Sequence, residues 1–273
     1  MEPPHKILPK RKVFPFMQLP AEIRNIIYGY TLTDPMGISF AATFEHRRRK
    51  TKRISSKLQK TLSGLYYKNM DSGEDLQEEE PVPLTPSLLA VSKQIHREGI
   101  DILYDNEFTF SDSFALYAFM INMGPAGAKQ VKKIKLRGWL DGRGTRGYNH
   151  CCFAALMSAT NLTSFHIETS SAMDSSPISM AEQLYRDAFP WLESMAAAKG
   201  KLDAGVDVLK FGDAFFGRSW PCLLLTKPLS KEEKTDMFKT ELRKLLGAQQ
   251  QMVMGNAPPP KKKKTVKNID AEE

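Results

Sequence analysis

The sequence contains little cysteine and no long hydrophobic run, and both absences exclude classes of protein. Three cysteines in 273 residues, Cys151, Cys152 and Cys222, supply neither a disulfide framework nor a CxxC metal site, so we expect a reducing compartment. The longest apolar run, residues 151–157, is much shorter than the roughly 18 residues that a membrane span requires. The N-terminal residues also lack the apolar core of a signal peptide. We therefore expect neither secretion nor insertion into a membrane.

Catalytic and cofactor-binding patterns are also missing. His150 precedes two thiols, but adjacent residues of a helix point in different directions, so structural cysteines explain the trio better than an activated nucleophile. The glycine-rich segment 138–147 lacks both the GK[ST] and the GxGxxG patterns of phosphate-binding loops. None of the five histidines has metal-ligand spacing. The sequence thus predicts a protein that is not an enzyme and that needs no cofactor and no metal.

The charge that is present is distributed unevenly. The formal net charge is +8, and residues 1–70 hold 14 basic and 4 acidic side chains. Residues 71–80 hold 6 acidic side chains and no basic one, whereas residues 81–255 are nearly balanced, with 20 basic and 18 acidic. The basic excess therefore belongs to the N-terminal quarter and to the tail at 256–273, not to the expected folded body.

Three basic clusters lie in stretches of low hydrophobicity. Importin binds extended basic peptides, and such peptides also contact nucleic acid non-specifically or simply keep a chain soluble. The three together favour a nuclear location, alone or shared with the cytoplasm, and the residues that would carry it are Lys10, Arg11, Lys12, Arg47, Arg48, Arg49, Lys50, Lys261, Lys262, Lys263 and Lys264. In the acidic block, Ser72 is a candidate phosphorylation site, although acidic linkers are common.

Hydrophobic periodicity predicts helices in the first half, separated by a polar insertion. Pro20 suits a first helical turn, and apolar side chains of one helix face follow at Ile23, Ile26, Ile27 and Tyr30. From about 35 to 84 this pattern is lost among basic, acidic and proline-rich residues, so we expect a mostly disordered insertion. Helices are expected again at 85–104 and 112–123, with a strand at 107–110.

The second half alternates between strand and helix patterns. Three segments, 131–136, 162–167 and 206–211, share the pattern apolar-x-x-apolar-x-apolar, with helical patterns between them. Strands connected in this way usually form a parallel sheet. The pattern matches the strand of a leucine-rich repeat, although the spacing is longer and any buried parallel strand gives a similar pattern. We predict an α/β fold (α+β overall) with a small, mostly parallel, irregular leucine-rich-repeat-like sheet, a further strand at 220–225 and a last helix from Ser230.

The first half resembles an F-box in two pieces, as found in the F-box-like proteins of filamentous fungi. The residues that carry the resemblance are LPAEIRNIIY at 19–28, LLAVSKQIHRE at 88–98 and LYDNEFTF at 103–110. The resemblance implies helices that dock on the small adaptor subunit of an SCF-type cullin-RING ubiquitin ligase. It also implies a leucine-rich-repeat-like C-terminal region that holds a protein substrate, whose identity the sequence does not name. The insertion between the two pieces departs from a usual F-box.

By position, the resemblance implies adaptor contacts from Leu19, Pro20, Ile23, Ile26, Ile27, Leu88, Val91 and Ile95. An apolar helix face of this kind either docks on a partner or closes the core of its own domain. The expected domains are a disordered basic arm at 1–13, F-box-like helices at 14–124 with the insertion, an α/β domain at 125–247 and a disordered Lys-rich tail at 248–273. The alternative is a nuclear interaction or nucleic-acid-associated protein with an F-box-like fold and no ligase role.

Loops that leave the C-terminal ends of parallel strands line the usual recognition crevice of an α/β sheet. Here these loops combine aromatic residues with arginines, a composition typical of interface hot spots or of a phosphopeptide clamp. The residues predicted to contact the substrate are Trp139, Arg143, Arg146, Tyr148, Phe215, Phe216, Arg218 and Trp220. Alternatively, Phe215 and Phe216 close the edge of the sheet and the arginines are solvated.

Overall fold

One six-stranded sheet organises the chain. The computed structural model describes residues 14–45, 48–55, 80–139, 147–168, 176–213, 215–216 and 229–255. The strands are β1 (Ile38–Glu45), β2 (Arg48–Ile54), β3 (Glu107–Phe110), β4 (Lys133–Leu136), β5 (Ser164–Ile167) and β6 (Leu209–Phe211). Their order in the sheet is β2-β1-β3-β4-β5-β6. Only β2 is antiparallel to its neighbour, so the predicted α/β class with a mostly parallel sheet is confirmed.

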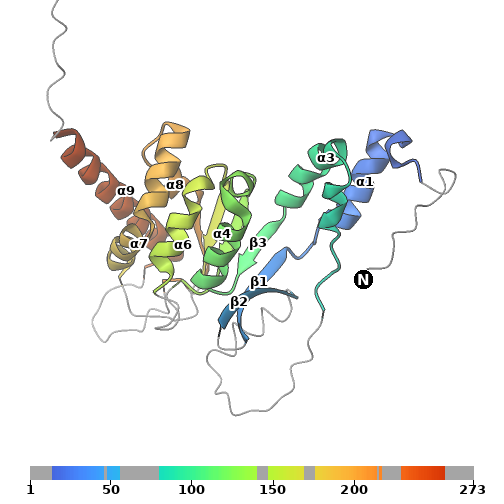
Figure 1. Ribbon diagram of the computed structural model, residues 1–273. Helices are drawn as coiled ribbons and strands as arrows, with labels where there is room; N and C mark the ends of the chain where they lie inside the picture. The colour runs from blue at the N-terminus through green and yellow to red at the C-terminus, as the bar shows by residue number, and fades with distance from the viewer. Residues whose placement is uncertain are drawn as a thin grey trace, which may run out of the picture.

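Helices connect the parallel strands in sequence order. They are α4 (Ser113–Ala128) before β4, α6 (Asn149–Ala155) with the 3-10 helix η4 (Leu156–Ser158) before β5, and α7 (Pro177–Lys199) with α8 (Ala204–Val208) before β6. Each connection advances to the next strand in the same direction, so right-handed crossovers place these helices on one face of the sheet. The last helix, α9 (Lys231–Gly255), packs on α7 (Figure 1). No helix in the described ranges is long and apolar enough to cross a membrane.

A pair of helices lies at the other end of the molecule. Helix α1 (Ala21–Leu32), preceded by η2 (Phe16–Gln18), lies beside α3 (Lys93–Tyr104), which is preceded by η3 (Pro86–Ala90). In Figure 1 this pair stands apart from α6–α9, and β1 and β3 lead from it into the sheet. The two helices therefore form a separate end of the molecule that is joined to the sheet through two adjacent parallel strands.

The main core lies between the strands and the helices that cross over them. Alternate residues of β3 to β6 are buried toward the helices, in pairs that include Phe108 and Phe110, Ile134 and Leu136, and Phe165 and Ile167. Trp191 of α7 packs edge-on against Phe165, with 5.3 Å between ring centroids. Burial of each such side chain contributes about 1.5–3 kcal/mol, so this layer supplies much of the stability of the fold.

The predicted disorder of residues 35–84 is wrong for part of the segment. Residues 38–45 and 48–54 form β1 and β2, paired from Ser39–Ile54 to Glu45–Arg48, and β1 also pairs with β3. Ile38 and Phe40 point to the helix side, where Phe40 stacks on Phe110 at 5.6 Å. The basic composition of β2 suits its place at the sheet edge, because charged edge strands discourage pairing with other chains. Residues 56–79 lie outside the described residues.

The domain boundaries also need correction. The expected division at 124/125 falls inside one continuous sheet, because β3 of the first part pairs with β4 of the second. Residues 248–255, assigned to the disordered tail, belong to α9. The strand expected at 206–211 begins at Leu209, since Val206 lies in α8. The strand expected at 220–225, the arm at 1–13 and the tail beyond Gly255 fall outside the described residues.

Candidate docking surface

The apolar face of α1 points to solvent. Ile23 is 43%, Ile26 54% and Tyr30 83% exposed, although their spacing is that of a core-facing helix stripe. The side of α1 that faces the protein carries Arg24, Tyr28 and Leu32 instead, of which the last two are fully buried. The stripe therefore does not close the core of its own domain, and its apolar side chains are available to a partner.

A charged group anchors the other side of α1 to α3. Arg24 forms two parallel hydrogen bonds to the Glu98 carboxylate, from Nε to Oε2 and from Nη2 to Oε1, each at 2.9 Å. Tyr28 donates its hydroxyl to Glu98 at 3.0 Å, and the Gln94 amide donates to it at 3.0 Å. The hydrogen bonds from Arg24, Gln94 and Tyr28 lower the pKa of Glu98 from 4.5 to about 2.

An apolar cluster lies behind this group. Tyr28, Leu32, Leu89 and Ile95 are buried together, and Phe16 of η2 packs edge-on against Tyr28 at 5.7 Å. Gly99 of α3 permits this close packing, since a Cβ there would lie 2.7 Å from a Leu89 methyl group. The Ser92 hydroxyl caps α3 by accepting from the Ile95 N–H at 3.2 Å. The helix pair therefore has its own core, and α1 keeps its position without using the exposed stripe.

The predicted adaptor contacts divide into three groups. Pro20, Ile23, Ile26 and Val91 are exposed, and Val91 is 68% exposed at the end of η3. Leu19, Ile27 and Leu88 are half-buried. Ile95 is 3% exposed inside the cluster, so its assignment to a docking surface is wrong. Exposed apolar side chains that the prediction did not include are Phe14, Met17 and Tyr30.

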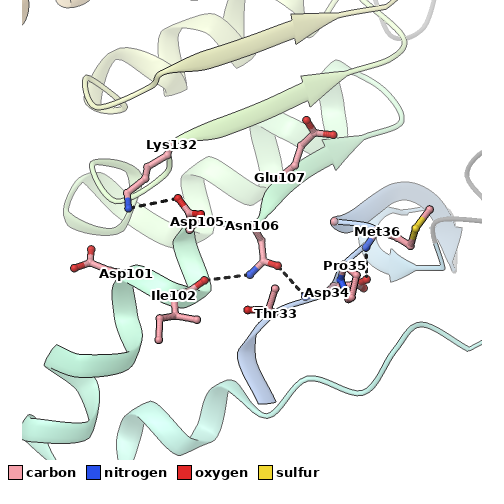
Figure 2. A pocket seen from close by; sticks show the side chains of 11 residues that line it. Thr33, Asp34, Pro35, Met36, Asp101, Ile102, Asp105, Asn106, Glu107 and Lys132 are labelled. Carbon is pink, nitrogen blue, oxygen red and sulfur yellow. Dashed lines mark hydrogen bonds and ion pairs between the residues drawn. The ribbon is translucent and has the colours of Figure 1, made fainter. Parts of the chain in front are cut away.

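Asn106 links the helix pair to the sheet. Its buried side chain accepts the Asp34 N–H at 2.9 Å and donates to the carbonyl oxygens of Leu32 at 2.8 Å and Leu103 at 2.7 Å. It thus joins the C-terminal end of α1 to that of α3; Figure 2 shows its hydrogen bonds to Asp34, just beyond α1, and to the Ile102 carbonyl in the last turn of α3. The side-chain amide satisfies backbone groups that would otherwise be unpaired at both helix ends.

The cavity beside Asn106 has a volume of about 640 Å³ and is lined largely by polar residues (Figure 2). Two of its four carboxylates form ion pairs: Asp34 contacts Arg53 at 3.1 Å, and Asp105 contacts Lys132 at 3.6 Å and Lys133 at 3.2 Å. Nowhere in the described part of the chain do three His, Cys, Asp or Glu residues gather as a metal site would require. The paired carboxylates tie the helix pair to the sheet.

Three of the predicted substrate-contacting aromatic residues, Trp139, Phe215 and Phe216, are buried. Trp139 and Phe215 stack at 5.9 Å, and Phe215 and Phe216 pack around Phe211 and Phe238. Their exposures of 0%, 1% and 7% leave no surface for a substrate, so this assignment is wrong and Phe215 and Phe216 close the sheet edge. Tyr148 is half-buried against Phe114 at 5.0 Å. Arg143, Arg146, Arg218 and Trp220 lie outside the described residues.

A buried carboxylate, Asp187, binds the Trp139 and Asn149 side chains. Asp187 of α7 accepts hydrogen bonds from Trp139 Nε1 at 3.0 Å, Asn149 at 3.2 Å and Gln183 at 3.0 Å. Burial raises the pKa of Asp187, while these hydrogen bonds oppose the rise. Burial also raises the pKa of the nearby Cys152 thiol, which disfavours the thiolate that a nucleophile requires.

Part of the predicted nuclear-localisation signal is ordered. Arg48, Arg49 and Lys50 belong to β2 and are hydrogen-bonded to β1, which conflicts with an extended peptide free to enter an importin groove. The other residues of the prediction, together with Ser72, lie outside the described residues; they are Lys10, Arg11, Lys12, Arg47, Lys261, Lys262, Lys263 and Lys264.

Comparison with known proteins gives one match. A family model described as "Domain of unknown function (DUF7730)" matches residues 10–147, just over half of the chain. This range contains the helix pair, β1 to β4 and the whole of the candidate surface. No curated protein and no solved structure matches the chain.

Proposed function

This chain belongs to the DUF7730 family of unknown function, and from its geometry we propose that it is a non-enzymatic protein-interaction module. In this proposal the exposed face of α1 docks on the small adaptor subunit of an SCF-type cullin-RING ubiquitin ligase. The sheet domain then presents a protein substrate. The observation that carries the proposal is the outward apolar stripe of α1, formed by Ile23, Ile26 and Tyr30.

The anchoring of α1 supports a docking role. The Arg24–Glu98 pair and the cluster around Tyr28 hold the helix from one side, so the apolar stripe is presented on a rigid element. Rigid presentation reduces the entropy cost of binding. An exposed amphipathic helix is also a common means of recognition between proteins.

Co-elution tests the proposal. The full chain and a purified adaptor subunit are mixed and separated by size-exclusion chromatography. The proposal predicts a complex with wild-type protein and none with Ile23→Ser/Ile26→Ser. A matched control, Ile121→Ser, removes an isoleucine that is 57% exposed on α4 and leaves the complex intact. Absence of a wild-type complex overturns the ligase role.

A second candidate is a nuclear interaction protein without a ligase role, with importin and non-specific nucleic acid as its partners. The observation that favours it is the basic edge strand β2, which carries Lys50 and Lys52 as exposed side chains. Because β2 is paired in the sheet, this candidate places the importin signal in residues 10–12 and 261–264. A fluorescent fusion with both of those clusters neutralised should then leave the nucleus.

A further inference from the structure

A second cavity, of about 620 Å³, lies where η3 meets the first turns of α3. Apolar side chains of Leu89 and Val91 line it together with Lys93, His96 and Arg97 of α3. Val91 is 68% exposed, whereas Leu89 is 8% exposed and belongs to the core of the helix pair. No Asp or Glu is among the described residues that line this cavity. Its volume is within the range of ligand-binding sites.

The two cations of this cavity form no ion pair with the described part of the chain. Lys93 and Arg97 are exposed, and the described hydrogen bond of the Arg97 guanidinium goes to the Lys93 backbone carbonyl, at 3.4 Å. Glu98, on the same helix, is bound by Arg24 instead. Asp101, one turn beyond Arg97, lines the polar cavity of Figure 2. Both cations are therefore available to an external anion.

These cations also conflict with the helix that carries them. The first turn of α3 contains no acidic residue, and its first residue is Lys93. The N-terminal end of a helix dipole is positive, so a cation there is unfavourable. Lys93 and Arg97 are four residues apart, a spacing at which like charges on a helix repel each other. Departures from such local rules are expected at functional sites, and an anion bound in the cavity would relieve both conflicts.

The combination of apolar and basic walls favours an acidic polypeptide over nucleic acid. No Phe, Tyr or Trp is among the described lining residues, whereas proteins that bind single strands rely on aromatic rings for base stacking. A phosphate backbone would also leave the exposed Val91 side chain without an apolar partner. A peptide that carries an apolar side chain beside carboxylates is complementary to both parts of the cavity.

We propose that this cavity binds a segment of a partner protein in which an apolar side chain lies beside glutamates or aspartates. The apolar side chain packs on Leu89 and Val91, and the carboxylates pair with Lys93 and Arg97. The site goes beyond the docking of α1, because none of its lining residues belongs to that helix. It does not require the ligase role.

Fluorescence anisotropy with purified full-length protein tests the proposal. The probe is a labelled peptide in which two leucines separate three pairs of glutamates, and two control peptides replace the glutamates by glutamine or the leucines by serine. The test variants are Lys93→Gln/Arg97→Gln for the cations and Val91→Ser for the apolar wall. The matched control, Arg186→Gln/Lys199→Gln, removes one exposed arginine and one exposed lysine of α7 and has the same net charge as the first variant.

The proposal predicts that the acidic peptide binds, that both control peptides bind more weakly and that added salt weakens binding. Each test variant should lose at least about fivefold in affinity, and the matched control should stay within about twofold of wild type. Equal losses in Lys93→Gln/Arg97→Gln and in the matched control would show an effect of net charge alone and would overturn the proposal.

Thermal unfolding separates a role in binding from a role in folding. Glutamine has a helix propensity close to those of lysine and arginine, so Lys93→Gln/Arg97→Gln changes mainly the charge. Because both cations are unfavourable within α3, this variant should melt at the wild-type temperature or above it. A lower melting temperature would show that the cations stabilise the fold, and it would contradict the proposal.

Two other occupants are outcomes of the same binding experiment. Tighter binding of a single-stranded oligonucleotide of equal charge would overturn the proposal. So would peptide binding that requires removal of residues 71–80, because the chain's own acidic block would then be the occupant. No ligase component is present, so failure here is distinct from failure of α1 docking.

Discussion

The Arg24 guanidinium on α1 and the Glu98 carboxylate on α3 form a bidentate pair at 2.9 Å, 74 residues apart in the chain. The pair joins residues 19–28 to residues 88–98, the two segments whose sequences resemble parts of an F-box, across the long segment between them. It also determines which side of α1 faces the protein and therefore leaves the apolar stripe exposed.

Glu98→Gln should lower the melting temperature and remove a pH dependence. The folded protein holds the pKa of Glu98 at about 2, below its ordinary value of 4.5. A lowered pKa stabilises the fold fully above about 4.5, and this contribution is lost as the pH falls toward about 2. The melting temperatures of wild type and variant, followed by circular dichroism, should therefore converge as the pH falls through this range. A constant difference would contradict the assigned role of the pair.

Asn106→Ala should destabilise the joint between the helix pair and the sheet. The variant leaves the Asp34 N–H and the Leu32 carbonyl without their partner, which costs about 1–3 kcal/mol. Urea unfolding measures this change. Asn25→Ala, at an exposed position of α1, should stay within about 0.5 kcal/mol of wild type. Equal effects of the two variants would show that Asn106 has no special role.

Asp187→Ala should destabilise the packing around the Trp139 side chain. It removes the acceptor of three hydrogen bonds, from Trp139, Asn149 and Gln183, and should cost about 2–4 kcal/mol. Tryptophan fluorescence during chemical unfolding reports the change. The exposed Glu182 on the same helix provides the control, because Glu182→Ala removes a carboxylate without a buried partner. If Asp187→Ala had the same free energy of unfolding as the wild type, these three hydrogen bonds would not have the role described.

Two glycine substitutions should change the stability of the protein in opposite directions. A Cβ on Gly138 would lie 2.5 Å from the backbone oxygen of Ser111, so Gly138→Ala should destabilise by about 1–3 kcal/mol. A Cβ on Gly247, within α9, has no atom within 4 Å, so Gly247→Ala should stabilise by up to about 1 kcal/mol. Thermal unfolding compares them, and destabilisation by Gly247→Ala would contradict the described helix.

The sequence predicted the elements whose pattern is local and strong. The segments around Phe108, Ile134 and Phe165 show continuous strand patterns, and the helices between them follow from periodicity and capping residues. β1 was missed because its alternation is weakened by Ser39, Ala41 and Ala42. β2 was missed because its basic residues indicated a solvent-exposed, disordered segment, although basic side chains are compatible with an edge strand.

The apolar residues of the candidate surface were predicted from the sequence, but the contacts that hold α1 in place were not. Periodicity identified the stripe of Ile23, Ile26 and Tyr30, yet no local pattern states whether such a stripe is buried. The deciding residue, Glu98, is distant in sequence and lies on another helix. The opposite charges of Arg24 and Glu98, one in each of the two segments, were the only feature of the sequence that pointed to this contact. The burial of Trp139 and Phe215 depends likewise on packing between distant segments.

Isothermal titration calorimetry with the purified adaptor subunit tests the central claim most directly. Docking through α1 predicts a measurable Kd for wild-type protein and a loss in affinity of at least about tenfold for Ile23→Ser/Ile26→Ser, because exposed apolar anchors supply most of the energy of such an interface. The control Ile121→Ser/Met157→Ser, which removes comparably exposed side chains of α4 and η4, should keep the wild-type Kd. The same Kd for all three proteins, or no binding by the wild type, would contradict docking through α1.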